Sequence, residues 1–338
     1  MKRISFLIAV LILCLLNVQA QRIIALQNGS KVFFHQNIDT IMVHSESGDT
    51  IYLPGYTYNK NLTISKKLTI YGTGHYPDST AATNPTRIYG TLILTTAASG
   101  STFEGISLEG DISMPAGNTF NNFIFSRMKF NNLNMGYINQ PSTLLMFNEC
   151  VIVGYIFGSI NVTNVVFEKC IIQGVIQSFE NVTLINHCIL LTNGIVNYSG
   201  WSASNFYHCN GIEANSNVIV GNYVNYPNTC TFKNNLIVAA PGLIFPNQGN
   251  IESQAFAGIF ENIITGKEYT FDYENDYHLK LTSAGIGAGF DNTDTGIYGT
   301  EYPFKINPSN PHVSVLNNAT EVKNGKLKVD VTVEAQSR

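Results

Sequence analysis

Five ionisable residues recur at similar intervals through the middle of the sequence. At gaps of 22, 20, 18 and 21 residues they are Arg127, Glu149, Lys169, His187 and His208. If each holds the same position in a stacked repeat, they form one row with neighbours about 5 Å apart. A polysaccharide lyase needs a basic group beside acidic ones, and adjacent His187 and His208 could share a metal ion or a proton. Alternating charge on a solvated corner of a repeat protein would give the same row, so both interpretations stay open.

Two smaller groups of residues suggest ligands. Asp291 and Asp294, with Asp276 as a possible third member, offer the hard oxygen ligands that calcium takes. The alternative is that these aspartates only cap turns at the end of the repeats. No other cofactor is expected. Tyr198 and Trp201 lie in the longest aromatic insert, and their ring faces are candidates for stacking on sugars, with local loop packing as the alternative.

The elements that position these residues follow from a longer repeat. At gaps of 22, 22, 20, 18, 21 and 26 residues the sequence has Phe103, Phe125, Phe147, Phe167, Ile185, Phe206 and Phe232. Further uncharged residues stand three and five positions after each one. Offsets of 0, 3 and 5 cannot share one face of a flat strand, because side chains alternate with period 2. Each repeat therefore predicts a strand, a two-residue corner and a second strand.

Repeats of about 20 residues that bear strands and cannot bury their own apolar face predict a solenoid. The fold class expected is all-β, a single-stranded right-handed parallel β-helix of about ten coils. Four cysteines hold the same inward slot of consecutive repeats, and Cys230 lies two residues before Phe232. They are expected to be buried thiols that pack as small apolar side chains: Cys150, Cys170, Cys188 and Cys209.

The ends of the chain predict four segments. Residues 1–20 have Lys2 and Arg3, an apolar run and small residues before Gln21, which is typical of a secretory signal peptide. Residues 21–47 are expected to cap the first coil, residues 48–300 to form the β-helix, and residues 301–338 to form a linker and a β-hairpin. The hairpin strands, His312 to Leu316 and Lys326 to Val333, would be joined across Asn324-Gly325. We expect a secreted protein with no membrane span.

Charge limits the classes of partner. Cleavage after residue 20 would leave 318 residues with a formal charge of −6, and charged residues make up only 12% of the chain. Such a chain has no basic footprint for nucleic acid. An extracellular polysaccharide or a protein is the partner expected.

A second set of apolar residues is expected to face outward. It comprises Val151, Val153, Ile171, Ile189, Leu191, Ile212, Leu236 and Val238. Apolar stripes of this kind are seldom left in contact with water. The C-terminal hairpin, a wrapped loop or a second subunit could cover this one, so an oligomer formed through the stripe is one expectation.

Two segments carry a family resemblance. GDTIYLPGYTYNKNLTISKKLTIYGTG, from Gly48 to Gly74, resembles the opening turn of secreted bacterial right-handed β-helix proteins of the pectate-lyase-like superfamily. SAGIGAGFDNTDTGIYG, from Ser283 to Gly299, is similar to their closing signature. The resemblance implies the β-helix fold, whereas activity varies widely across this superfamily.

The catalytic signatures of two related enzyme groups are missing. Gly154 stands where a similar segment of pectin methylesterases has its catalytic aspartate. Asn292-Thr293-Asp294 resembles one motif of polygalacturonases without the second carboxylate that hydrolysis needs. The sequence therefore favours a non-catalytic secreted protein that binds glycan or protein, with a lyase-type enzyme acting on extracellular polysaccharide as the alternative.

Overall fold

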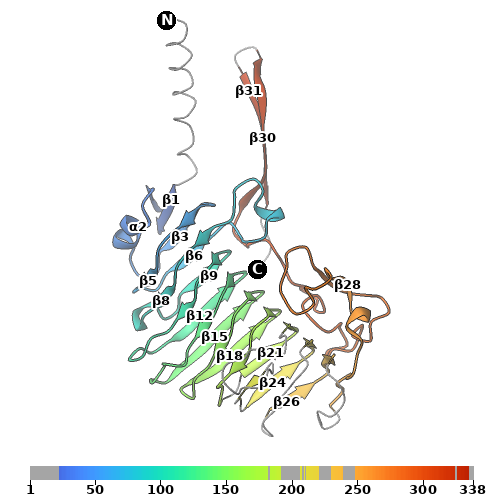
Figure 1. Ribbon diagram of the computed structural model, residues 1–338. Coiled ribbons are helices and arrows are strands. Elements are labelled where there is room, and N and C mark those ends of the chain that lie inside the picture. Colours follow the sequence, from blue (N-terminus) through green and yellow to red (C-terminus); the bar gives the residue numbers. More distant parts are fainter. Residues whose placement is uncertain are drawn as a thin grey trace, which may run out of the picture.

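The structure is a computed structural model that describes residues 23–181, 183–191, 206–207, 209, 211–220, 230–238, 248–323 and 326–334. Three parallel sheets stack into a β-solenoid of about eight turns, fewer than the ten expected from the sequence. Figure 1 shows the strands of the largest sheet following one another from the blue N-terminal end to the yellow end of the column. The β-helix expected from the repeat is confirmed.

The largest sheet has eleven strands. In spatial order they are β2 (Lys31–His35), β1 (Ile24–Asn28), β3 (Thr50–Tyr52), β6 (Thr69–Tyr71), β9 (Thr102–Glu104), β12 (Asn121–Ser126), β15 (Ser142–Asn148), β18 (Val162–Glu168), β21 (Thr183–Asn186), β24 (Ile212–Asn215) and β26 (Thr231–Lys233). From β3 onward every pairing in it is parallel.

The other two sheets of the column are built from short strands. The nine-stranded sheet contains β4 (Thr57–Tyr58), β7 (Arg87–Ile88), β10 (Ser107–Leu108), β13 (Lys129–Phe130), β16 (Val151–Ile152), β19 (Ile171–Ile172), β22 (Ile189–Leu190), β25 (Val218–Ile219) and β27 (Leu236–Ile237). The seven-stranded sheet contains β5 (Leu62–Ile64), β8 (Leu92–Leu94), β11 (Ile112–Ser113), β14 (Leu133–Asn134), β17 (Ile156–Phe157), β20 (Ile176–Gln177) and β23 (Phe206–Tyr207).

A short helix and a hairpin cover the first coil. Strands β1 and β2 pair antiparallel, and α2 (Ile38–His44) follows β2. Asn37 caps this helix, because its side chain accepts a hydrogen bond from the amide of Asp39 at 2.7 Å. Ile38 and Ile41 are buried and belong to the same core cluster as the coils. The cap therefore closes the apolar interior of the column at this end.

The predicted corner lies between the first and second sheets. One residue of each corner has a positive φ between 48° and 71°: Gly105, Arg127, Glu149, Lys169, His187, Ser216 and Asn234. This left-handed conformation turns the chain between two strands, so the residues at offsets 0, 3 and 5 can all point inward. The repeated offset in the sequence is thus explained by a repeated backbone bend.

Stacked phenylalanines fill the centre of the column. The rings of Phe103, Phe125, Phe147 and Phe167 lie 5.3, 4.8 and 4.9 Å apart between successive centroids, within 14° of parallel. Ile185, Ala214 and Phe232 continue this file. The assignment of Phe206 to it was wrong, because Phe206 pairs with Ile176 in the seven-stranded sheet. The coil from Ile185 to Ala214 is longer than the four coils between Phe103 and Ile185, which shifts the repeat.

The inward cysteine slot changes to asparagine along the column. Cys150, Cys170 and Cys188 are buried free thiols, and each donates from Sγ to a carbonyl of the coil before it. Their slot is continued by Asn217, Asn235 and Asn250. Each of these amides donates to the same kind of carbonyl and accepts from the backbone amide of the preceding coil. Cys209 is also a buried free thiol, but it bonds Ile176 O instead of continuing the slot.

The outward apolar stripe is covered by the chain itself. After the last stacked strand, which ends at Ile237, residues 256–306 return along the outside of the column. This return segment contains three short elements, η4 (Phe256–Gly258), β28 (Phe260–Asn262) and β29 (Asp276–Leu279). Its Ile259, Phe260, Tyr277, Ile297 and Phe304 form one buried cluster with the stripe, where Ile171 is only 1% exposed.

Two details of the expected stripe and boundary need correction. Ile212 belongs to the inner core, and Val218 and Val220 occupy the stripe instead. The expected end of the solenoid at residue 300 falls within the return segment, beyond the last stacked strand. Two further 3₁₀ turns, η2 (Asp78–Thr80) and η3 (Thr96–Ala98), lie in connections between strands of the first coils.

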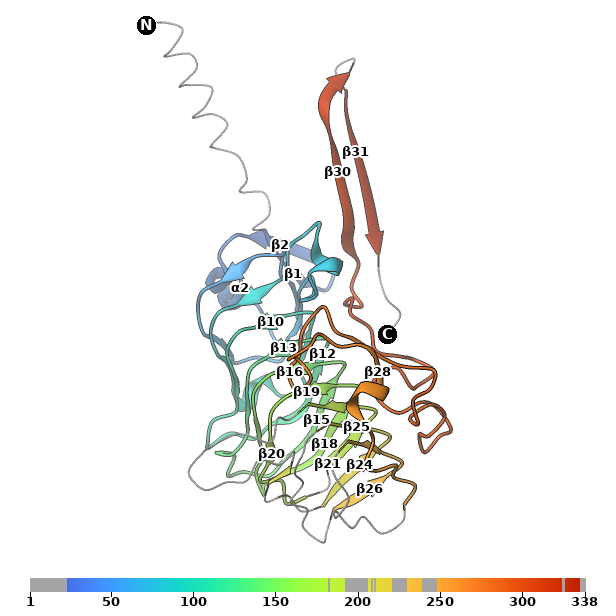
Figure 2. The ribbon, with the colours of Figure 1, turned by 45° about the vertical axis from the view of Figure 1, so that its right-hand side comes forward.

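The C-terminal hairpin stands apart from the column. Strands β30 (His312–Lys323) and β31 (Lys326–Glu334) pair antiparallel into a long two-stranded ribbon, in line with the expected hairpin. In both Figure 1 and Figure 2 this ribbon extends past the end of the column that carries β1 and β2.

Candidate functional site

Most of the row of ionisable residues is a buried seam instead of a solvated corner; among its described members Lys169 is half-buried. The side chains of Glu104, Arg127 and Glu149 are 7%, 7% and 3% exposed. Arg127 donates from Nη1 to Glu104 at 2.9 Å and from Nε to Glu149 at 2.7 Å. Buried charges are stabilised only when they are paired and hydrogen-bonded. The guanidinium and both carboxylates therefore satisfy one another.

The return segment and the residues after it bind this row, one coil after another. Lys305 N donates to Glu149 at 3.1 Å, and Ser309 Oγ donates to Glu104 at 2.7 Å. Four further contacts continue toward the other end of the column: Lys169 Nζ to Tyr302 O, His187 Nε2 with Thr293 Oγ1, Phe290 N to Ser216 Oγ, and Asn234 Nδ2 to Ala288 O. These contacts attach the return segment, and the residues up to Ser309, to the column.

The described neighbour of His187 in the row is Ser216 and not the expected His208. Asn186 pairs with Asn215, so Ser216 follows His187 in the row. His208 lies outside the described residues, as do Tyr198 and Trp201. His187 is buried against Thr293 and lies 3.8 Å from Asp291. Burial lowers the pKa of His187, and the negative charge of Asp291 partly opposes that shift.

The three aspartates considered for calcium form turns. Asp291 Oδ1 accepts from Thr293 Oγ1 at 2.7 Å, Asp294 Oδ1 accepts from Gly287 N at 2.8 Å, and Asp276 Oδ1 accepts from His278 N at 3.0 Å. Within the part of the chain that the structure describes, no three His, Cys, Asp or Glu side chains lie close enough together to hold a metal ion between them. The same part has no helix long and apolar enough to cross a membrane.

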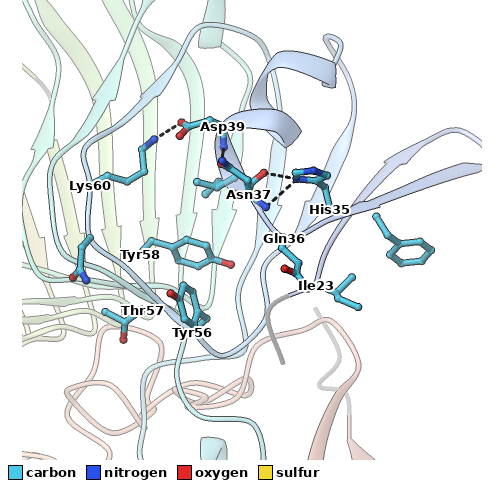
Figure 3. A pocket seen from close by; sticks show the side chains of 12 residues that line it. Ile23, His35, Gln36, Asn37, Asp39, Tyr56, Thr57, Tyr58 and Lys60 are labelled. Atoms are coloured by element: carbon cyan, nitrogen blue, oxygen red, sulfur yellow. Dashed lines mark hydrogen bonds and ion pairs between the residues drawn. The ribbon is translucent and has the colours of Figure 1, made fainter. Parts of the chain in front are cut away.

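A pocket of about 770 Å³ lies between the cap and the first coil. One side is formed by β4, whose Tyr58 occupies the inward slot of the first coil, and by Tyr56 just before it. These two rings meet edge to face, with centroids 5.1 Å apart. The opposite side is the connection from β2 to α2, including His35, Gln36 and Asn37. Figure 3 shows the two tyrosines facing these polar residues across the pocket.

Polar groups at the rim of the pocket are fixed by one another. Asn37 N donates to His35 Nδ1 at 3.0 Å, so the other ring nitrogen of His35 carries the proton in the neutral form. Lys60 forms an ion pair with Asp39 across the rim, with side chains that are 33% and 63% exposed (Figure 3). The pocket thus combines aromatic rings with oriented amide, imidazole and charged groups.

The hydroxyl of Tyr58 is the most informative group in the pocket. Tyr58 is only 6% exposed, and its buried hydroxyl has no hydrogen-bond partner among the described residues. Burial raises the pKa of Tyr58 well above its usual value, so the hydroxyl stays protonated. A buried hydroxyl without a partner costs about 1–3 kcal/mol. A water molecule or a ligand can supply the missing partner of such a group.

Sequence reasoning missed this pocket. Residues 21–47 were assigned only to covering the first coil. The signal that could have located it is the alternation of Tyr56 and Tyr58 directly after the Pro54-Gly55 turn, in the first coil that the cap must meet. A tyrosine at an inward position places its hydroxyl group in an apolar interior, where that hydroxyl needs a hydrogen-bond partner.

Comparison with known proteins gives no match: no family model, no curated protein and no solved structure is significantly similar to this chain.

Proposed function

We propose that this protein is a secreted, non-catalytic β-helix protein that binds a glycan, and that the pocket between the cap and the first coil receives the sugar. The observation that carries the proposal is the unpaired hydroxyl of Tyr58 in a pocket lined by aromatic and amide side chains. The resemblance of Gly48 to Gly74 to secreted pectate-lyase-like proteins supports the same compartment and ligand class.

The chemistry of the pocket suits a carbohydrate ring. Sugars present apolar C–H faces that pack on aromatic rings, and Tyr56 and Tyr58 offer such surfaces. The hydroxyl groups of a sugar both donate and accept hydrogen bonds, so they can pair with the amides of Gln36 and Asn37 and with the hydroxyl of Tyr58. The volume of about 770 Å³ lies in the range of small-molecule sites.

The state of the ionisable row supports binding over catalysis. A lyase base must reach the proton of its substrate. Arg127 is held by two carboxylates, Lys169 donates to Tyr302 O, and His187 contacts Thr293. These bonds tie the candidate bases of the row to the rest of the protein.

The test is a glycan array together with a polysaccharide degradation panel, using residues 21–338 with calcium and with a chelator. We expect binding of one glycan class and no degradation. Calorimetry with the best ligand then compares Tyr56→Ala with Tyr155→Ala, an exposed tyrosine farther along the column. Tyr56→Ala should weaken binding at least tenfold and Tyr155→Ala should not. Degradation of any uronate polymer would favour the lyase alternative, and equal effects of the two variants would move the site elsewhere.

A further inference from the structure

A second pocket lies on the outer face of the largest sheet, where β6, β9, β12 and β15 run side by side (Figure 1). This sheet pocket has a volume of about 280 Å³ and shares no lining residue with the pocket at the cap. Two rows of outward side chains form its floor. The parallel register places Thr69, Thr102 and Ile124 in one row and Tyr71, Glu104, Ser126 and Asn148 in the other. Arg127 and Ser309 complete the lining.

Arg127 brings an unsatisfied donor to the sheet pocket. Only 6% of this residue is exposed. Its Nε donates to Glu149 and its Nη1 to Glu104, whereas its Nη2 has no hydrogen-bond partner among the described residues. A buried donor without a partner costs about 1–3 kcal/mol. Since Arg127 lines the sheet pocket, an acceptor oxygen from outside the chain can reach it there.

The charge around Arg127 limits the kind of molecule that supplies this oxygen. Glu104 and Arg127 are the charged residues of the lining, and Glu149 binds the same guanidinium. One guanidinium and two carboxylates together carry a formal charge of −1. A carboxylate, sulfate or phosphate on a ligand would therefore be repelled by the group as a whole. A hydroxyl, ring or carbonyl oxygen of a neutral molecule is the acceptor that fits.

The floor of the sheet pocket suits a sugar ring. The hydroxyls of Thr69, Thr102 and Ser126 have no partner among the described residues, and each can donate or accept a hydrogen bond. Ile124 is 39% exposed and offers an apolar surface beside them. Several hydroxyls around one apolar side chain match a small ring that has hydroxyls at its edge and C–H groups on its faces. The volume lies just below the range of sites for drug-sized ligands, so it suits a single ring.

We propose that the sheet pocket is a carbohydrate site that binds one neutral sugar residue, with an oxygen of the sugar accepting a hydrogen bond from Arg127 Nη2. Hydroxyls of the sugar pair with Thr102 and Ser126, and one face of its ring lies against Ile124. The charge network that attaches the returning chain to the column thereby also selects uncharged sugars. Because the two pockets share no residue, this site does not depend on binding at the cap.

An NMR titration with matched sugar pairs tests the selectivity, using residues 21–338 with Tyr56→Ala so that binding at the cap pocket is weakened. The pairs are glucose with glucuronate, galactose with galacturonate, and mannose with mannuronate, which differ only in the carboxylate. At least one neutral sugar should bind with a dissociation constant of about 1–10 mM, and its uronate at least tenfold more weakly. If no neutral sugar binds, or if the uronate binds equally well, the proposal is wrong.

Two matched variants locate the site. Thr102→Phe fills the sheet pocket, whereas Thr63→Phe makes the same change on the outer face of the seven-stranded sheet, outside both pockets. Phenylalanine is favourable in strands, and far-UV circular dichroism and thermal melting verify each fold. Thr102→Phe should raise the dissociation constant of the neutral sugar at least tenfold, and Thr63→Phe less than twofold. Equal effects of the two changes would overturn the proposal.

A smaller substitution decides the question if Thr102→Phe does not fold. Ser126→Ala removes one hydroxyl without adding bulk, so it should raise the dissociation constant about two- to tenfold. An unchanged constant would contradict the site. The outcome is separate from that at the cap: loss of sugar binding with Thr102→Phe supports the sheet pocket even if Tyr56→Ala alone leaves glycan binding of the unmodified chain intact, a result that would count only against the cap pocket.

Discussion

Ser309 donates its hydroxyl to the carboxylate of Glu104 at 2.7 Å, although the two residues are 205 positions apart in the sequence. The same carboxylate accepts from Arg127, which also binds Glu149. The end of the returning chain is therefore fixed to the middle of the column through a buried charge network. The returning chain thus follows the row from Asn234 to Glu104, one coil after another.

Replacing Arg127 with methionine should destabilise the protein by about 3–5 kcal/mol, because two buried carboxylates lose their shared partner. Urea denaturation at pH 7 measures this loss. Lys129→Met is the control, since Lys129 pairs with Glu109 at 3.7 Å with both side chains partly exposed. We expect a loss below about 1 kcal/mol for that pair. A similar loss for both variants would show that the buried network does not stabilise the seam.

The sequence predicted the file of Phe103, Phe125, Phe147 and Phe167 correctly, because a strand, a bend and a strand of constant length give a constant period. The prediction failed after Ile185, where a longer coil brings Ala214, not Phe206, into the file. Phe206 and Cys209 have the spacing of the repeat but do not occupy its inward positions in the stack. Asn217 continues the cysteine slot since its amide makes the same backbone hydrogen bonds, a likeness that an apolar pattern cannot reveal.

The candidate site was less predictable than the fold. The spacing placed Arg127 and Glu149 in one row correctly, but their burial depends on a return segment more than 150 residues away. The pocket depends on Tyr58 meeting the connection before α2, a contact between two segments that have no common repeat. The repeat in the sequence indicates only contacts between coils of the column. The burial of the charged row and the pocket arise where the return segment and the N-terminal cap pack against the column.

Stability should fall as the pH drops below about 6.5, partly because of His75. Burial, with a smaller effect from the charge of Lys129, lowers the pKa of His75 to about 3. The folded protein thus keeps this ring neutral, while the unfolded chain takes up a proton near pH 6.5 and is favoured below it. One such group costs about 2 kcal/mol between pH 7 and pH 5.

Urea denaturation of His75→Phe at several pH values isolates this contribution. Phenylalanine keeps a ring beside Tyr76, 4.6 Å from His75 between centroids, and cannot be protonated. The variant should lose less stability than the unmodified protein between pH 7 and pH 5. Some dependence should remain, because burial also lowers the pKa of His187. Equal pH profiles would show that His75 takes up its proton without unfolding.

Tyr58→Phe should stabilise the free protein and weaken glycan binding. The change removes a buried hydroxyl that has no partner among the described residues, so we expect a gain of about 1 kcal/mol in urea denaturation. The ligand loses a hydrogen bond at the same time, which should raise the dissociation constant about tenfold by calorimetry. If the hydroxyl of Tyr58 stabilised the fold, Tyr58→Phe would lower the free energy of unfolding instead of raising it. An unchanged dissociation constant would show that the ligand does not contact Tyr58.

Leu144→Asn should stabilise the column. Leu144 has a φ of 58° and is 51% exposed, so its side chain gains little from burial while its backbone is strained. The equivalent positions of the neighbouring coils hold Asn122 and Asn164, with φ values of 60° and 54°. Asparagine tolerates this conformation better than leucine, and we expect a gain of about 0.5–1 kcal/mol in urea denaturation. Leu144→Ala removes the exposed apolar side chain but keeps the strain, so a gain as large as that of asparagine would attribute the effect to exposure instead of φ.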